Sequence, residues 1–263
     1  MRALSIAATG MLAQQTNVEV IANNLANMNT TGFKQQRAEF ADLLYQNIMT
    51  PGSQTSDQGT YAPGGIQLGA GVKTAATYRV TTQGDLQNSG NPYDVAVKGQ
   101  GYFRIQMADG TDAFTRAGNF SLSPQGQIVT QDGALVQPGI AIPANTVSVQ
   151  INAQGQVNAT VAGQSTPQTV GQLELNVFPN EAGLNAVGEN LLLQTNASGA
   201  PQAGVPGSPG YGTVQQGFLE TSNVNSVNEI TNLITAQRAY EMNSKVITAA
   251  DQMMQQTSQM ARG

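Results

Sequence analysis

Apolar side chains recur every seven residues near the start of the chain. The first row consists of Leu4, Met11, Val18 and Leu25, and a second row, three places on, consists of Ala7, Gln14, Ile21 and Met28. This spacing predicts an amphipathic helix with a coiled-coil seam, broken once by a polar residue. Because one helix cannot bury such a stripe alone, the helix needs a partner.

A second heptad pattern lies at the other end of the chain, between residues 224 and 260. Its main row is Leu233, Tyr240, Ile247 and Met254, and the stripe is widened by Ile230, Ala236, Val246, Ala250, Met253 and Met260. We therefore expect the two terminal helices to pair and the rest of the chain to be inserted between them. The alternative is that each stripe packs on an ordinary globular core.

The segments that follow the first helix carry two further patterns. The spacing of Phe40, Leu43, Leu44 and Ile48 predicts a helical extension over residues 35–48. Residues 51–71 are rich in Gly, Ser, Thr and Gln, which predicts an extended loop or linker. A loop of this length is uncommon in a compact protein and is usually functional or disordered. From Val72 to Val80 the period changes to two, as in a strand.

Short alternating segments separated by turn signals occupy the middle of the chain. Asp109-Gly110 and Asp132-Gly133 are strong hairpin pairs, and Asn152–Gly155 is another tight turn. Closely spaced short strands predict an antiparallel β domain. We also expect a hairpin turn at Lys98–Gly101.

A Pro- and Gly-rich return loop and a capped helix are expected at the end of the chain. Residues 196–212 have the composition of a loop, and residues 214–221 could add a last strand. Asn223 or Ser226 is expected to cap the terminal helix, since Glu229 follows Ser226 by three residues. The predicted fold class is α+β, with an assembly core formed by an N-terminal helix over residues 1–34 and a C-terminal helix over residues 223–263. Between them we expect a helical extension, insert and connecting β segment at 35–93, an outward-facing antiparallel β domain at 94–195 and a return linker at 196–222.

Composition excludes several classes of function. The chain has 263 residues, a net charge of −5 and only 10% charged residues, which makes nucleic acid an unsuitable partner. It has no Cys and no His, so disulfides, thiolate metal sites and the commonest general base are excluded. No segment reaches the ~20 apolar residues of a membrane span, and the first heptads run through any plausible signal-peptide cleavage point.

The candidate catalytic motifs are weak. Gly99-x-Gly101 is followed by a strand rather than a helix, unlike a dinucleotide fingerprint. The carboxylates Asp85, Asp94, Asp132 and Glu174 are scattered along the sequence. We therefore expect no enzyme activity, no cofactor and no metal.

Four stretches resemble the rod and hook axial proteins of the bacterial flagellum. They are Ala22–Lys34 (ANNLANMNTTGFK), Asp94–Phe103 (DVAVKGQGYF), and the pair Glu220–Asn225 (ETSNVN) and Gln237–Glu241 (QRAYE). Within that family, the length of the chain and the insert at Pro51–Gly71 favour the distal-rod members. Another rod or hook-type subunit is the nearest alternative.

The resemblance implies a rigid helical homopolymer that serves as drive shaft and export channel. It implies export without a cleaved signal peptide by the flagellar type III apparatus, and a place in the periplasmic basal body. The implied neighbours are the proximal rod proteins, a hook or hook-junction protein, and the P and L ring proteins around the shaft. An ordered Pro51–Gly71 segment would brace neighbouring subunits.

The expected self-assembly residues follow from the two seams and the motif. They are Leu4, Met11, Val18, Ile21, Leu25, Asn24, Asn27, Leu233, Tyr240, Ile247 and Met254. Asparagines are poor helix formers, so we expect Asn24 and Asn27 to form hydrogen bonds across subunits.

The rival interpretation is a secreted, self-associating carbohydrate-binding protein, with peptidoglycan as the obvious ligand. A peptidoglycan-cleaving enzyme is a third possibility. A row of exposed aromatic residues would mark the binding protein, but aromatics make up only 5% of the chain.

Overall fold

The computed structural model describes residues 2–52, 64–164 and 166–260. The chain divides into two compact units, each built from separate stretches of sequence. The helical unit contains Met1–Leu25, Gln36–Tyr78 and Asn225–Gly263, and the β unit contains Ala26–Gln35 and Arg79–Val224.

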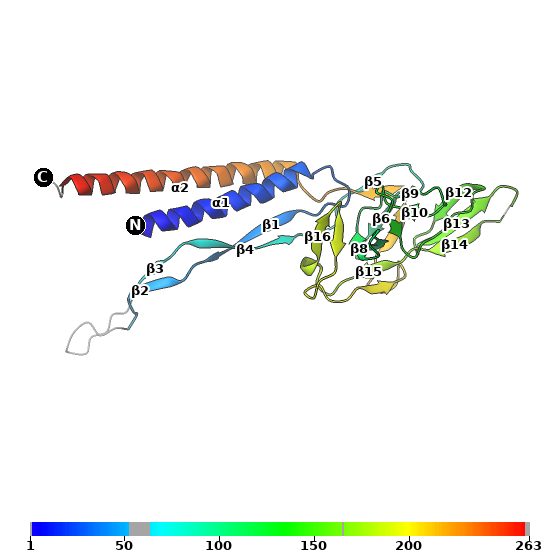
Figure 1. Cartoon of the computed structure of the whole chain (residues 1–263), viewed down its shortest axis with the longest axis horizontal. Helices are drawn as coiled ribbons and strands as arrows, with labels where there is room; N and C mark the ends of the chain where they lie inside the picture. The colour runs from blue at the N-terminus through cyan, green and yellow to red at the C-terminus, as the bar shows by residue number, and fades with distance from the viewer. Residues whose placement is uncertain (1, 53–63, 165, 261–263) are drawn as a thin grey trace. The chain divides into compact units, whose positions relative to one another are not determined.

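Two long helices lie side by side in the helical unit (Figure 1). They are α1, Arg2–Ala26, and α2, Ser226–Met260. Asn24 bonds Glu229, and Gly10 packs on the side chain of Asn243, so the two helices run antiparallel. The expected α+β class, with paired terminal helices and an inserted antiparallel β region, is confirmed. Neither helix, over the residues described, is long and apolar enough to cross a membrane.

Both ends of the helix pair differ in detail from the sequence prediction. Helix α1 stops at Ala26 rather than near Lys34, because the Asn-rich stretch turns instead. Gly32 adopts a left-handed conformation (φ +70°) in this turn, six residues after the end of the helix. The N-cap of α2 is Asn225, whose Oδ1 accepts the Asn228 N–H at 3.1 Å.

The helical extension predicted over residues 35–48 is wrong. This stretch forms strand β1, Gln36–Asp42, and begins strand β2, Tyr45–Met49. Strand β1 pairs with β4, Val72–Arg79, and β2 pairs antiparallel with β3, Ile66–Gly69. Non-local pairing overrides the local helical spacing here. We call the β2–β3 hairpin the arm; residues 53–63 of the predicted insert lie outside the described residues.

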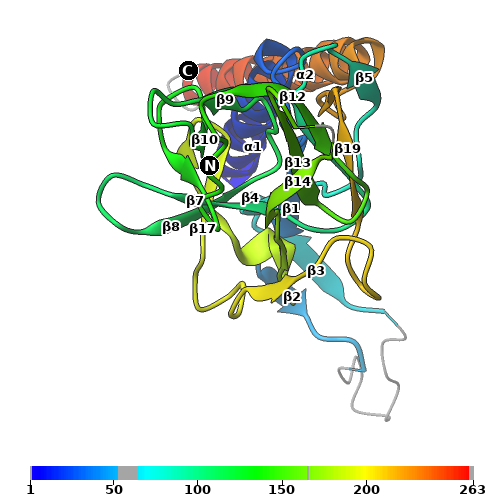
Figure 2. The ribbon, with the colours of Figure 1, turned by 90° about the vertical axis from the view of Figure 1, so that its right-hand side faces the viewer.

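The β unit contains several antiparallel sheets. A seven-stranded sheet has the order β16-β17-β8-β7-β11-β10-β9. A separate three-stranded sheet has the order β12-β13-β14, and Figure 2 shows its strands next to one another. Their strands are β7 Phe103–Gln106, β8 Asp112–Thr115, β9 Ser121–Leu122, β10 Ile128–Val129, β11 Leu135–Val136, β12 Thr146–Ile151, β13 Gln156–Val161, β14 Gln168–Gln172, β16 Asn185–Gly188 and β17 Leu191–Leu193. The two-stranded pairs are β15 Leu175–Val177 with β18 Gln202–Gly204, β19 Thr213–Gln216 with β6 Val95–Lys98, and β20 Phe218–Glu220 with β5 Leu86–Asn88.

The turn predictions hold with two exceptions. Gly110, Gly133 and Gly155 all have positive φ in tight turns, as Asp-Gly and Gln-Gly signals require. Lys98–Gly101 is not a hairpin turn, because β6 pairs with β19 whereas β7 pairs with β8 and β11. The return segment is also less irregular than its composition predicts, since β18 lies within it.

Apolar side chains from these strands form the core of the β unit. The main cluster includes Val97, Phe103, Ile105, Val157 and Leu175, all essentially inaccessible to solvent. A smaller cluster consists of Tyr102, Phe114, Phe178 and Leu184. The core therefore brings together residues from across the inserted sequence.

Candidate functional site

One buried carboxylate joins the two ends of the β unit. Glu220 is fully buried. Its Oε1 accepts hydrogen bonds from the Lys34 ammonium at 2.5 Å and from the Gly84 N–H at 3.0 Å. Its Oε2 accepts the Arg116 guanidinium at 3.2 Å. The three charged side chains come from before, within and after the inserted β sequence. We call them the charged triad.

The turn before Lys34 places that residue against the carboxylate. The Gly32 N–H donates to the Glu220 carbonyl at 2.8 Å. A Cβ at Gly32 would lie 2.8 Å from the Ala117 nitrogen, and the φ of +70° also disfavours any larger residue. Glycine is thus required at position 32 for this turn to lie against Arg116, Ala117 and Glu220.

Burial sets the electrostatics of the triad. Desolvation lowers the pKa of Lys34 below its usual range, and the hydrogen bond to Glu220 opposes that shift. Arg116 also donates to the Gly99 carbonyl at 2.6 Å, and its guanidinium carbon lies 5.3 Å from the centre of the Tyr102 ring. Burial and the nearby Glu181 carboxylate raise the pKa of Tyr102, so this phenol stays protonated.

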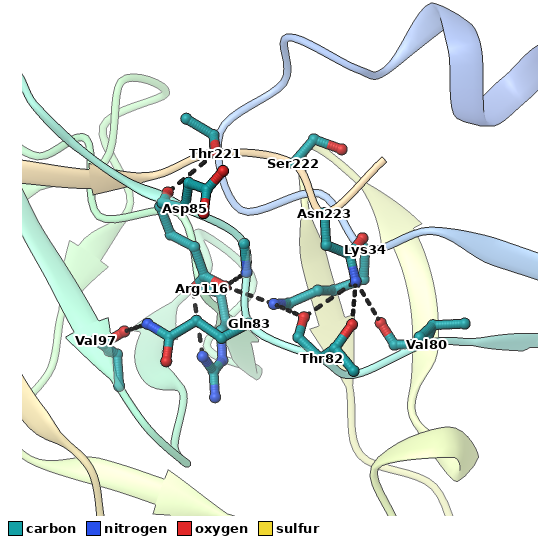
Figure 3. A network of polar contacts seen from close by, with 12 residues as sticks. Lys34, Val80, Thr82, Gln83, Asp85, Val97, Arg116, Thr221, Ser222 and Asn223 are labelled. Atoms are coloured by element: carbon teal, nitrogen blue, oxygen red, sulfur yellow. Dashed lines mark hydrogen bonds and ion pairs between the residues drawn. The ribbon is translucent and has the colours of Figure 1, made fainter. Parts of the chain in front are cut away.

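Asn223 lies beside the triad and connects separate segments of the β unit by hydrogen bonds (Figure 3). Its Oδ1 accepts the Gln35 N–H at 2.7 Å, and its Nδ2 donates to the carbonyls of Val80 and Thr82 at 3.0 Å. Thr221 donates to the Asp85 carbonyl next to it. This occupation explains why Asn223 does not cap α2.

Asn24 plays a comparable part within the helical unit. Its Oδ1 accepts the Gln36 N–H at 2.8 Å, and its Nδ2 donates to the Gln36 carbonyl at 2.7 Å and to Glu229 at 3.1 Å. Asn24 and Glu229 are both almost completely buried. A single amide therefore fastens α1 both to strand β1 and to α2.

The other expected assembly residues are distributed over the helix pair. Asn24 and Ile21 are buried; Leu4, Met11, Val18, Leu25, Asn27, Leu233, Ile247 and Met254 are half-buried, and Tyr240 is exposed. Asn27 lies in the turn after α1, where its Oδ1 accepts the Thr30 hydroxyl. The C-terminal row borders the face on which Asn243 meets α1. Its contacts with other copies stay a prediction.

A further apolar row of α2 flanks this seam on the side opposite the Leu233 row. Val246, Met253 and Met260 are 48%, 61% and 77% exposed, and they also recur every seven residues. The sequence pattern marked them only as a widening of the stripe. It did not show that the seam would be filled by Ala236, Asn243 and Ala250, which leaves this row uncovered.

The structure also brings two carboxylates together that the sequence left apart. Asp132 and Glu189 line the same open hollow of about 280 Å³ in the β unit, beside Thr31 and Asn190. Both are exposed. Among the described residues, no group of three or more Asp, Glu, His or Cys side chains is placed to hold a metal. The enzyme alternative can therefore be tested at this hollow.

Three family models match separate ranges of the chain. Residues 4–34 match a model described as "Flagella basal body rod protein", and residues 96–159 match "Flagellar hook protein FlgE/F/G D1 domain". Residues 215–260 match "Flagellar basal body rod FlgEFG protein C-terminal". Each matched range contributes one member of the charged triad.

Full-length relatives agree with these matches. The chain is 58% identical over 260 residues to the flagellar basal-body rod protein FlgG of Caulobacter vibrioides, covering 99% of both chains. It is 54% identical over 253 residues to FlgG of Agrobacterium fabrum, covering 96% of this chain and 97% of the relative. The rod protein FlgF of Caulobacter vibrioides is 32% identical over 264 residues, covering 99% and 95%. The chain belongs to the flagellar basal-body rod protein family.

Proposed function

We propose that this protein is a structural subunit of the flagellar distal rod, which polymerises into a rigid helical tube. The higher identity to FlgG than to FlgF from the same organism supports the distal-rod assignment. The observation that carries the proposal is the uncovered apolar row of α2. Such a surface on a long helix needs other copies of the chain to bury it.

Burying this row against other copies would contribute a large favourable free energy to self-association. Fully burying a Val or Met side chain contributes about 1.5–3 kcal/mol. Val246, Met253 and Met260 together would supply several kcal/mol for each copy, and more apolar side chains lie on the same helix, including Ile234 and Met242. Polymerisation places every copy against several neighbours, so these contributions repeat along the tube.

The arm provides a second surface for neighbouring copies. Its exposed apolar residues are Tyr45, Ile48, Ile66 and Leu68, and Leu44, which directly precedes β2, is 89% exposed. We propose that the arm lies on adjacent subunits and braces the tube. Helices packed along the tube and braced in this way would resist bending, as a drive shaft requires.

Other partners follow from this assignment. Proximal rod proteins would lie below the polymer, a hook or hook-junction protein above it, and the P and L rings around it in the periplasm. The subunit would leave the cell unprocessed through the flagellar type III apparatus, and the tube would serve as an export channel. The low charge of the chain, 10% of residues, suits repeated self-association.

Replacing Met253 by glutamate tests the proposal. The unmodified protein should form straight tubes in electron micrographs, and the variant should fail to polymerise or need a much higher concentration. Gln252→Glu adds the same charge at an exposed neighbouring position off the apolar row. Equal polymerisation by M253E and Q252E would contradict the assignment of this row.

The carbohydrate-binding and enzyme alternatives need separate measurements. Sedimentation with purified peptidoglycan sacculi should leave the protein in the supernatant, and no soluble fragments should be released. Retention or turnover that disappears in Asp132→Asn or Glu189→Gln would instead assign a sugar site to the hollow.

A further inference from the structure

The arm joins the rest of the helical unit through a short break in the ribbon. The Leu43 N–H donates to the Gly71 carbonyl at 2.8 Å, and the Ala70 N–H donates to the Leu44 carbonyl at 3.2 Å. Gly71 has φ +123°, a conformation that residues with a Cβ rarely adopt. The four residues form the root of the arm, where β1 passes to β2 and β3 passes to β4.

Helix α1 contacts this root at Thr9. The Thr9 hydroxyl donates to the Ile6 carbonyl at 2.8 Å and accepts the Val72 N–H at 3.3 Å. A Cβ at Gly71 would overlap the same hydroxyl. Rotating the Thr9 side chain away would lose both of its hydrogen bonds. The root therefore approaches the helix so closely that only glycine fits.

A second contact fastens the same helix to the other end of β1. Asn24 bonds both backbone groups of Gln36, and it lies fifteen residues after Thr9 along α1. At 1.5 Å per residue, the two contacts are about 22 Å apart. A ribbon held at one point can pivot about that point, whereas two separated contacts also determine its direction.

We propose that the Thr9–Gly71 contact sets the direction in which the arm leaves α1, and through the arm the helical geometry of the polymer. Thr9 and Gly71 are positioning residues, since the exposed apolar side chains lie beyond the root on β2 and β3. The occupant of the arm's apolar surface is a second copy of this chain. That part of the inference rests on the proposed function; the direction of the arm does not.

Distance measurements between spin labels test the first part in the full-length protein. The chain has no Cys, so Gln15→Cys on α1 and Gln46→Cys on β2 introduce two unique labelling sites at exposed positions. Thr9→Val keeps the β-branched shape and removes the hydroxyl, and Gly71→Ala introduces the overlap. We expect both to shift or broaden the distance distribution, and Thr9→Ser to restore it.

A matched glycine separates positioning from backbone strain. Gly110 also has positive φ (+81°), but a Cβ there would meet nothing within 4 Å. Gly110→Ala should strain its turn and leave the distance distribution unchanged. Distributions for T9V and G71A that match the unsubstituted protein, at unchanged helicity, would overturn the proposed role of the contact.

Electron microscopy of the polymers tests the second part. Thr9→Val should still polymerise, with an altered helical repeat or curvature, and Thr9→Ser should restore the unmodified repeat. If T9V moves the arm but leaves the repeat unchanged, the link from arm to polymer geometry is wrong. If the unmodified chain forms no polymer, the proposed function fails, whereas the spin-label result on arm direction stands.

Discussion

Replacing Glu220 by glutamine isolates the contribution of the charged triad. The side chain is fully buried, and glutamine has nearly the same volume, so the core stays filled. The change removes the negative charge and leaves Lys34 and Arg116, which are 7% and 5% exposed, without their carboxylate partner. Because charged groups are costly to bury unpaired, the β unit should become much less stable.

The expected loss follows from the burial of both partners. Removing one member of a buried ion pair costs about 3–5 kcal/mol, against a total stability of about 5–15 kcal/mol for a typical protein. With a urea dependence of about 2 kcal/mol per M, the unfolding midpoint should fall by roughly 1.5–2.5 M. Near-ultraviolet circular dichroism of the buried Tyr and Phe rings would follow the unfolding of the β unit.

Two further variants make this reasoning testable. The Arg104–Asp112 pair, 3.5 Å apart, is 33% and 45% exposed, so Asp112→Asn should cost less than about 1 kcal/mol. Adding Lys34→Met to Glu220→Gln removes one unpaired charge and should restore part of the loss. A loss below about 1 kcal/mol for E220Q, or fully additive losses in the double variant, would refute the argument.

Two other predictions concern single side chains. Asn24→Ala removes the bonds to Gln36 and Glu229, so it should lower the free energy of unfolding by about 1–3 kcal/mol and weaken polymerisation; in thermal unfolding, an equal loss from the exposed Asn29→Ala would contradict this. The raised pKa of Tyr102 means that the folded protein keeps a proton that the unfolded chain releases near pH 10. Stability should therefore fall as pH rises through about 10, and Tyr102→Phe should show a smaller fall in urea unfolding; identical pH profiles would show that Tyr102 does not contribute.

Much of the architecture was predictable from local patterns. The heptad rows of Leu4–Met28 and Leu233–Met260 marked both helices, because side chains three and four residues apart lie on one helical face. Asp-Gly pairs marked hairpin turns in the β unit, because glycine tolerates positive φ. These signals depend on interactions between near neighbours in the chain, so a single sequence contains them.

The arm shows where local patterns fail. Phe40, Leu44 and Ile48 have helical spacing, but all three are exposed, and Phe40 lies on β1 and Ile48 on β2. The partners of these strands, β4 and β3, come more than fifteen residues later in the chain. Whether such a segment is helix or strand depends on a partner that the local sequence does not reveal. The same applies to the cap of α2, since the hydrogen bonds of Asn223 to Gln35, Val80 and Thr82 leave capping to Asn225.

The sequence alone therefore determined the terminal helices, the turns of the β unit and the family, and it placed Lys34 and Glu220 inside recognisable motifs. Only the tertiary structure decided that these two residues, 186 positions apart, form a buried ion pair, and that Arg116 binds the same Glu220 carboxylate. The physical reason is that an ion pair between distant residues forms only after the intervening chain has folded back on itself. Burial then strongly favours the pairing, because each cation would be costly to keep in the interior without the carboxylate.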